Sequence, residues 1–186
     1  MTTINHKTSN RLSSCSLFLI GFMGTGKSTI AAELAKHLGL EVLEMDETIE
    51  KQEGMSIPDI FSTYGEAYFR KLETDLLKET GNIGNRIVSC GGGAAARAEN
   101  VAEMKKSGVI LLLTAAPETI LTRIEDNDDR PLLRGRKNTA DIAALIASRK
   151  PAYDAAADYT ISTDNKSVAD ITQEILNLLS KEGIFA

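Results

Sequence analysis

The sequence has 186 residues, of which 42% are hydrophobic and 25% are charged. This length fits one α/β domain, and the composition is that of a globular chain, which excludes a disordered one. The net charge of −5 at pH 7, without any basic run, argues against nucleic-acid binding.

Residues 1–14 are polar and lack the apolar segment of a secretory signal, so we expect an extension outside the fold. Cys15 and Cys90 are too few for a disulfide framework, which favours a reducing cytoplasm. The apolar run Val109–Leu113 is long enough for a buried strand but not for a membrane span. We therefore expect a single domain over residues 15–186.

Short apolar runs alternate with longer segments of helical period, which is typical of βαβ units and a parallel sheet covered on both faces. The predicted strands are Leu17–Ile20, Glu41–Met45, Arg86–Ser89, Val109–Leu113 and Tyr159–Ser162. The predicted helices are Lys27–Leu38, Glu66–Thr80, Ala95–Lys106, Pro117–Glu125, Thr139–Ala152 and Ser167–Lys181, with a shorter one from about Pro58 to Tyr64. The pattern predicts a three-layer α/β fold with a five-stranded parallel sheet flanked by helices.

The segment GFMGTGKS, residues 21–28, follows the first predicted strand and opens a helix. This is the context and spacing of a P-loop, in which glycines let backbone amides face phosphate groups. We expect Lys27 to reach the β and γ oxygens and the Ser28 hydroxyl to ligate Mg²⁺. The residues assigned to ATP here are Gly24, Thr25, Gly26, Lys27, Ser28 and Thr29.

Two carboxylates lie at the end of the second predicted strand. Glu44 and Asp46 are two residues apart, so in a strand they would point to the same side, at the edge where ligands bind. Glu44 can hold Mg²⁺ through water, and Asp46 can orient or deprotonate an acceptor hydroxyl. The alternative is that Asp46 caps a helix that starts at Glu47.

Two arginines have both a structural and a functional interpretation. In GEAYFRKLE, residues 65–73, Arg70 is spaced for helix ion pairs with Glu66 and Glu73. Arg149, near the end of a predicted helix, has the position of a partner for the helix dipole. Spacing alone favours these structural roles.

Two segments without regular period follow strands or helices. Three consecutive glycines, Gly91, Gly92 and Gly93, leave the third strand, which indicates either a tight turn or a ligand close to the main chain. Residues 126–138, DNDDRPLLRGRKN, are dense in charge and predict a surface loop. This loop is long enough to act as a lid, although a solvated connector has the same composition.

Taken together and in this order, these motifs resemble the shikimate kinase family over nearly all of the chain after Ser14. Where the family has GxMGxGKST, an Asp before an Ile-Glu pair, GMSI, GExxFRxxE, GGG, RPLL and RxPxY, this sequence reads GFMGTGKST, DETIE, GMSIPDIF, GEAYFRKLE, GGG, RPLL and RKPAY. The resemblance implies a P-loop kinase that phosphorylates the 3-hydroxyl of shikimate with Mg²⁺ and ATP, giving shikimate 3-phosphate and ADP. It places the reaction on the pathway to chorismate and the aromatic amino acids.

The resemblance also implies roles for individual residues. Shikimate would contact Asp46, Arg70, Gly91, Gly92, Gly93 and Arg149. The two guanidinium groups would hold its carboxylate, because each can pair bidentately, and Asp46 would face its hydroxyl. Arg130, in the loop, would contact the transferring phosphates as a catalytic residue beside Lys27 and Asp46, while Arg123 would lie against adenine. Lys166, in the turn after the last strand, is a further ATP-binding candidate through its backbone.

One departure from the family concerns the metal: the family usually has Asp where this chain has Glu44, one methylene longer.

Three rival functions remain. A kinase for another small hydroxy acid is disfavoured by the arginine pair, and a guanine switch by NKSV at 165–168, which lacks the Asp of NKxD. A silent ATP-binding module depends on Glu44 alone. We expect ATP and shikimate as partners, no nucleic acid, no membrane, and a monomer, because no extended apolar face is evident.

Overall fold

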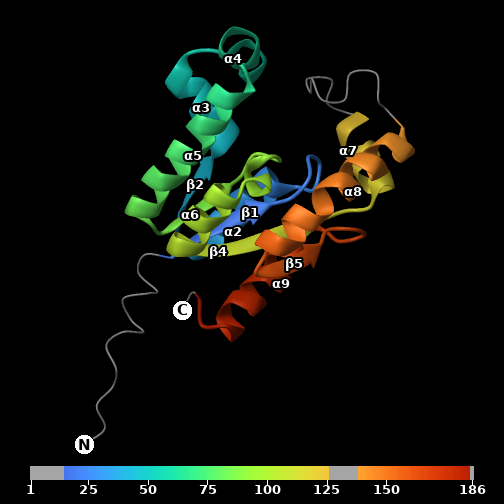
Figure 1. Ribbon diagram of the computed structural model, residues 1–186. Coiled ribbons are helices and arrows are strands. Elements are labelled where there is room, and N and C mark those ends of the chain that lie inside the picture. Colours follow the sequence, from blue (N-terminus) through green and yellow to red (C-terminus); the bar gives the residue numbers. More distant parts are fainter. Residues whose placement is uncertain (1–14, 126–137, 185–186) are drawn as a thin grey trace, which may run out of the picture.

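A computed structural model describes residues 15–125 and 138–184 (Figure 1). Its strands are β1 (Ser16–Ile20), β2 (Glu41–Glu44), β3 (Arg86–Ser89), β4 (Gly108–Thr114) and β5 (Tyr159–Ser162). In this part of the chain they form a five-stranded sheet of order β2-β3-β1-β4-β5, and every neighbouring pair is parallel. The predicted five-stranded parallel sheet is confirmed.

The helices connect the strands and cover both faces of the sheet. They are α2 (Lys27–Leu38), α3 (Met45–Glu53), α4 (Ile57–Tyr64), α5 (Glu66–Ile83), the 3-10 turn η1 (Ala94–Ala96), α6 (Ala98–Ser107), α7 (Pro117–Glu125), α8 (Thr139–Ala156) and α9 (Val168–Lys181). In Figure 1, α3 and α4 rise above one end of the sheet, while α7 and α8 lie at the other side. None of the described helices has the length and apolar character needed to cross a membrane.

Strand β1 separates two apolar cores. Successive side chains of a strand point to opposite faces of the sheet. Phe18 and Ile20 accordingly belong to the core under α3 to α8, whereas Leu17 and Leu19 belong to the core under α2 and α9. All four side chains are at most 1% exposed, which explains why the strand is apolar without alternation.

The order of the strands determines where a ligand can bind. Strand β1 lies between β3 and β4, so the chain leaves β1 and β3 at neighbouring positions on the carboxyl edge of the sheet. In open α/β sheets, ligands bind at this edge where the strand order reverses. The segments that follow β1, β2 and β3 therefore meet at one place.

The structure corrects the end of β2. The strand stops at Glu44, and Met45 is the first residue of α3. Asp46 therefore lies in the first helical turn and does not share a strand face with Glu44. The alternative that Asp46 caps a helix is wrong as well, because Glu44 holds the N-cap position. The cause is burial: Met45 and Ile49, four residues apart on one helical face, are both 0% exposed.

Other boundaries also differ from the sequence prediction. The segment predicted as a helix from Ala95 is η1 followed by α6, because Arg97 between them is extended, with φ of −109° and ψ of 122°. Helix α5 ends at Ile83, beyond the predicted end at Thr80. Helix α8 continues through Pro151 to Ala156, which is fully buried. Residues 1–14 and 126–137, which include nearly all of the predicted lid, lie outside the described residues.

Candidate active site

The loop after β1 has the backbone shape of an anion cradle. Gly21, Gly24 and Gly26 have φ angles of 141°, 77° and 94°, which side chains rarely allow. A β-carbon on Gly21 would lie 2.3 Å from Leu113 O, so only glycine fits there. Gly26 is the N-cap of α2 and has no side chain that could cap its amides. These amides and the helix dipole favour a bound phosphate.

The side chains of the loop divide into two groups. Thr25 is 1% exposed and its hydroxyl donates to Phe22 O at 2.8 Å, so it serves the loop itself. Lys27 Nζ donates to Gly21 O at 3.0 Å and to Phe22 O at 3.1 Å, so the ammonium group lies along the loop. Ser28 and Thr29 are exposed at the start of α2. A phosphate in the cradle would thus meet the ammonium group and this helix end.

Oxygen atoms from three elements meet beside the loop. Ser28 Oγ donates to Glu44 Oε2 at 3.1 Å and lies 3.5 Å from Ser89 Oγ at the end of β3. Among residues 15–125 and 138–184, no group of three or more His, Cys, Asp or Glu could hold a metal by itself. Mg²⁺ does not need such a group, since it uses one or two protein oxygens, several waters and substrate phosphates. Ser28 and Glu44 fit this requirement, and the longer Glu side chain reaches the hydroxyl.

Asp46 is directed to the glycine turn after β3. A β-carbon on Gly91 would lie 2.7 Å from Asp46 Oδ1 and 3.1 Å from Glu73 Oε1. Two carboxylates, one from α3 and one from α5, therefore flank the first glycine of the turn. The close approach explains why this position has no side chain.

Arg70 is held by two carboxylates of its own helix. Its guanidinium donates to Glu73 Oε2 at 2.8 Å and to Glu66 Oε1 at 3.1 Å from Nε and 3.0 Å from Nη2. It also lies over the Phe69 ring, 5.4 Å from the centroid. Burial disfavours the charged form, but the hydrogen bonds and charges of Glu73 and Glu66 outweigh it and raise the pKa of Arg70. The guanidinium is a fixed cation, 24% exposed.

Glu73 is more than a surface ion-pair partner, because its side chain is only 1% exposed. Its Oε1 atom has no hydrogen-bond partner among the described residues. Burial raises the pKa of the Glu73 carboxyl, the nearby charge of Asp46 acts in the same direction, and Arg70 opposes both. The site therefore contains a buried carboxylate that pairs with the arginine through one oxygen only.

The glycine turn itself contacts both arginines. A β-carbon on Gly93 would lie 2.5 Å from Nη1 of Arg70, and one on Gly92 would lie 3.2 Å from Nη1 of Arg149. The same position on Gly92 is 3.8 Å from Gly21 O of the phosphate loop. Two cations therefore flank successive glycines, directly beside the phosphate cradle.

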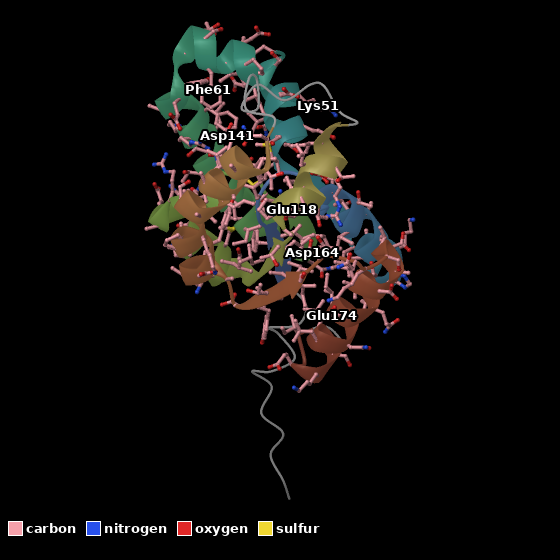
Figure 2. All side chains as sticks on the ribbon, turned by 90° about the vertical axis from the view of Figure 1, so that its right-hand side faces the viewer. Lys51, Phe61, Glu118, Asp141, Asp164 and Glu174 are labelled. Atoms are coloured by element: carbon pink, nitrogen blue, oxygen red, sulfur yellow. The ribbon has the colours of Figure 1, made fainter. Side chains whose placement is uncertain are left out.

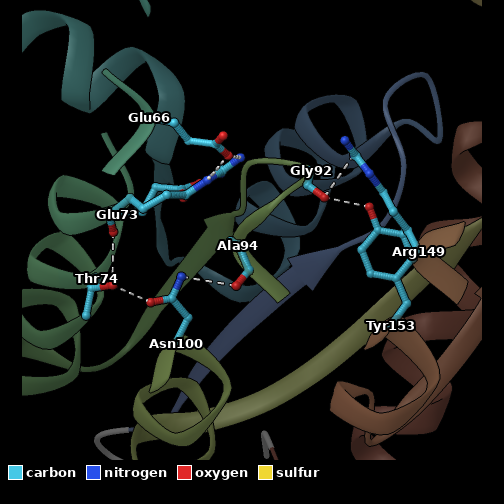
Figure 3. Close-up of polar contacts among 9 residues, drawn as sticks. Glu66, Glu73, Thr74, Gly92, Ala94, Asn100, Arg149 and Tyr153 are labelled. Atoms are coloured by element: carbon cyan, nitrogen blue, oxygen red, sulfur yellow. Dashed lines mark hydrogen bonds and ion pairs between the residues drawn. The ribbon is translucent and has the colours of Figure 1, made fainter. Parts of the chain in front are cut away.

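Helix α8 supplies the second arginine together with a tyrosine. Arg149 Nη1 and the Tyr153 hydroxyl both donate to Gly92 O, at 3.2 Å and 2.6 Å (Figure 3). Burial raises the pKa of Tyr153, which keeps the hydroxyl protonated as a donor. Arg149 also lies over the Phe22 ring, 5.4 Å from its centroid. Because α8 runs on to Ala156, Arg149 is not at a helix end, and the helix-dipole interpretation is wrong.

Arg123 joins the phosphate loop to the turn after β5. Its guanidinium donates to Gly24 O at 3.1 Å, and to the hydroxyl and carbonyl oxygens of Thr163, both at 3.0 Å. Asp164, which is labelled in Figure 2, lies in the same turn. It accepts from the amide of Ala116 at 2.9 Å and from the hydroxyl of Thr119 in α7 at 2.7 Å, and so holds the turn against α7. The contact with Gly24 puts Arg123 beside the phosphate cradle.

The side chain of one further predicted residue, Lys166, is not brought into this cluster. Lys166 forms an ion pair with Glu174 of α9, so its side chain is directed along that helix. Arg130 lies outside the described residues. Lys166 stays a candidate through its backbone, and Arg130 stays a prediction.

Sequence reasoning missed the roles of two residues in the site. From its spacing, the sequence predicts Glu73 only as one of two helix ion-pair partners of Arg70, and it predicts no role for Tyr153, although Tyr153 belongs to the RKPAY motif. Spacing cannot distinguish the buried Glu73 from the exposed Glu66, because both are one turn from Arg70. Tyr153 lies four residues after Arg149, and this helical spacing was the available signal.

Comparisons with known proteins agree on one family. The family model described as shikimate kinase matches residues 23–180. A shikimate kinase from Persephonella marina is 44% identical over 160 residues, which cover 86% of this chain and 96% of that protein. One from Geobacter sulfurreducens is 42% identical over 157 residues, covering 84% and 86%. The structure of the shikimate kinase from Acinetobacter baumannii in complex with shikimate has a TM-score of 0.85 and 34% identity, covering 94% of this chain and 98% of that one.

Proposed function

This chain belongs to the shikimate kinase family of ATP-dependent kinases, and from that premise we propose how its residues transfer a phosphoryl group from ATP to the 3-hydroxyl of shikimate. The products are shikimate 3-phosphate and ADP. The observation that carries the assignment of residues is the pair of cations on one turn: Arg70 beside Gly93 and Arg149 beside Gly92, next to Gly21 of the phosphate loop.

In the proposed complex, ATP lies on the loop of residues 21–28. The glycine-rich backbone and the N-terminus of α2 face its phosphates, and Lys27 contacts the β and γ oxygens. Mg²⁺ would be held by Ser28 directly and by Glu44 through water, and it would neutralise charge on the phosphates. The neighbouring oxygens of Ser28 and Glu44, 3.1 Å apart, support this assignment.

The acceptor lies between the glycine turn and the two arginines. Arg70 and Arg149 pair with its carboxylate, and the turn Gly91–Gly93 approaches it closely because no side chains intervene. Asp46 accepts a hydrogen bond from the 3-hydroxyl, which orients the oxygen and gives its proton a destination. The position of Asp46 beside Gly91 supports this role.

The 3-hydroxyl oxygen attacks the γ-phosphorus in line, and the bond between that phosphorus and the bridging oxygen of ADP breaks. Phosphoryl transfer has a loose transition state, so positioning and charge neutralisation outweigh proton removal. Lys27 and Arg130 supply positive charge at the transferring group. Arg123 lies against the adenine and Lys166 contacts the nucleotide through its backbone, while residues 126–138 close over the site and exclude water.

The proposal is tested by ADP release from Mg-ATP in the presence of shikimate, gluconate, quinate or a nucleoside monophosphate. We expect turnover with shikimate only. Turnover with another acceptor would keep the phosphate loop but contradict the roles of Arg70 and Arg149. Binding of ATP without any turnover would contradict the assignment of Glu44 to a working metal site.

The acceptor site has its own test in Arg70→Lys. Lysine keeps the charge but loses the planar pair of donors, so the KM for shikimate should rise about tenfold or more. The KM for ATP should stay within about twofold, because substitutions without shared partners act independently. Arg86→Lys is the matched control, since Arg86 pairs with Glu41 at the opposite end of β3 and β2. An equal effect of the two substitutions would contradict the assignment.

A further inference from the structure

A buried pair of polar side chains links helix α5 to the turn that follows β3. Thr74 in α5 is 3% exposed and Asn100 in α6 is 0% exposed. Thr74 Oγ1 lies 2.6 Å from Asn100 Oδ1, and Asn100 Nδ2 donates to Ala94 O at 3.0 Å. Figure 3 shows the three residues in a continuous line. Ala94 is the residue directly after the glycine turn.

The direction of each hydrogen bond in this line is determined. A carbonyl oxygen only accepts, so the amide nitrogen of Asn100 must face Ala94 O. Its amide oxygen then faces Thr74, whose hydroxyl must donate. Thr74 Oγ1 is also 3.0 Å from Arg70 O, but the contact with Asn100 is shorter. The single hydroxyl proton therefore serves the link to the turn.

Both ends of this link carry groups of the acceptor site. Thr74 follows Glu73 directly and lies one helical turn after Arg70. Ala94 follows Gly93, on which a β-carbon would lie 2.5 Å from Nη1 and 2.9 Å from Nη2 of Arg70. The guanidinium of Arg70 thus rests on the turn to which its own helix is bonded. A small slide between α5 and the turn would change the space between the guanidinium and the glycines.

We propose that Thr74 and Asn100 are positioning residues that fix the glycine turn relative to Arg70 and thereby set the affinity for the acceptor. This inference rests on the proposed acceptor site. Neither residue contacts the acceptor; both act through Arg70 and the turn. A hydrogen bond between buried groups is directional, and its loss leaves a buried atom unpaired, whereas apolar packing between two helices tolerates small shifts.

The test is Thr74→Val, with Thr80→Val as a matched control in the same helix. Thr80 is 1% exposed, and its hydroxyl donates to Leu76 O, four residues earlier, at 2.7 Å. The two substitutions thus remove the same kind of buried hydroxyl, but only Thr74 is bonded to Asn100. We expect Thr74→Val to raise the KM for shikimate about five- to tenfold, because small displacements in a site weaken binding strongly. The KM for ATP should stay within about twofold.

Thr80→Val should leave the KM for shikimate unchanged, whatever its effect on the melting temperature, because its hydroxyl donates only to Leu76 O of the same helix. Thr74→Ser restores the hydroxyl and should bring this KM back to within about twofold of the unsubstituted enzyme. Equal KM values for Thr74→Val and Thr80→Val, or no rescue by Thr74→Ser, would overturn the inference. If Thr74→Val does not fold, Thr74→Ala removes the same hydroxyl and decides by the same readout.

The failure of this inference and that of the acceptor site can be told apart. If Arg70→Lys raises the KM for shikimate and Thr74→Val does not, only the positioning role is wrong. If Arg70→Lys leaves this KM unchanged, the acceptor site itself is wrong. Titration calorimetry of shikimate with the same variants measures the affinity without turnover and should show the same order.

Discussion

Glu73 is a buried carboxyl whose protonation links the stability of the protein to pH. Burial raises its pKa above the ordinary Glu value of 4.5, so in the range above that value the folded state holds a proton more readily than the unfolded chain. The associated stability is fully present below the unfolded pKa and is lost as pH rises through the folded pKa. Relative to Glu73→Gln, which does not titrate, the unsubstituted protein should therefore gain stability as pH falls from 7 to 5.

Thermal unfolding at pH 7, 6 and 5 measures this difference. Glu99→Gln is the control, because the hydrogen bond from Lys78 lowers the pKa of Glu99, which gives a pH dependence of the opposite sign. The measured quantity is the stability of the unsubstituted protein minus that of Glu73→Gln, which should increase toward pH 5. If it stays constant or decreases, Glu73 does not take up the proton.

Lys27 is the residue whose loss should damage catalysis most directly. Its ammonium group lies against Gly21 and Phe22 of the phosphate loop. Lys27→Ala should lower kcat at least about 100-fold, because charge that stabilises the transition state is removed. Lys36→Ala, at an exposed position near the end of the same helix, should leave kcat unchanged. Turnover of Lys27→Ala within a few-fold of normal would contradict the phosphate assignment.

Glu44 allows a prediction about the metal. Its Oε2 atom accepts a hydrogen bond from Ser28 Oγ, the proposed Mg²⁺ ligand, at 3.1 Å. Glu44→Gln should raise the Mg²⁺ concentration for half-maximal turnover about tenfold or more, whereas Glu44→Asp should work within a few-fold. Removal of the metal with EDTA should stop turnover. Glu41→Gln, at the start of the same strand, is the control. An equal Mg²⁺ requirement for Glu44→Gln and Glu41→Gln would contradict the assignment.

At the scale of elements, the turn after β3 joins three helices into one site. Gly92 O is held from α8 by Arg149 and Tyr153, while Ala94 O is held from α6 by Asn100. Gly93 contacts Arg70 of α5. The geometry of the acceptor site is therefore a property of how these helices pack around the turn, and a change in the turn should affect acceptor binding before it affects stability.

Two glycine substitutions separate function from stability. Gly93→Ala places a methyl group against the Arg70 guanidinium, the end of a long side chain, so the KM for shikimate should rise about tenfold and the loss of stability should be smaller than that of Gly108→Ala. Gly108→Ala places the methyl group 1.9 Å from Ser16 O, in the backbone of the sheet. It should destabilise by about 1–3 kcal/mol or more without changing this KM. Thermal unfolding and steady-state kinetics of both variants test the contrast, which would fail if their effects were alike.

The boundary between β2 and α3 determines the direction of the Asp46 side chain. As a strand residue, Asp46 would have shared a direction with Glu44; as a residue of the first turn of α3, it points to Gly91 instead. The two carboxylates consequently serve different places, Glu44 the hydroxyl of Ser28 and Asp46 the glycine turn. This separation fits the proposed roles of Glu44 at the metal and Asp46 at the acceptor. The prediction that both carboxylates lie on one strand face was wrong.

At the scale of the whole molecule, the core of the described structure begins at β1. Ser16, Leu17 and Phe18 are each fully buried. We propose that residues 1–14 lie outside the single domain of residues 15–186, as the sequence predicts. A chain without residues 1–14 should keep kcat within about twofold and should unfold within a few degrees of the full chain. Loss of cooperative unfolding in the shortened chain would contradict the proposal.

We also propose that the enzyme is a cytoplasmic monomer. The large apolar side chains that are exposed among the described residues belong to four different elements; they are Val42 of β2, Tyr64 of α4, Ile83 of α5 and Val168 of α9. Neither Cys15 nor Cys90 forms a disulfide in the described part of the chain.

The sequence by itself determined the sheet, the phosphate loop and the family. Apolar runs, glycine spacing and short motifs depend on local backbone geometry, so they can be read without knowing what packs against them. The local pattern did not identify Arg70 and Arg149 as ligands of the acceptor, because their spacing favoured helix ion pairs and a helix dipole. That role was predicted only from the resemblance to the family.

Only the tertiary structure decided which of these local alternatives applies. Glu66 and Glu73 have equivalent spacing from Arg70, yet Glu73 is buried because α5 turns that side toward the glycine turn. Thr74 and Thr80 are both threonines of α5, yet only Thr74 forms a hydrogen bond with Asn100 of α6. Burial and pairing between distant segments depend on how helices pack, and no spacing within a single helix contains that information.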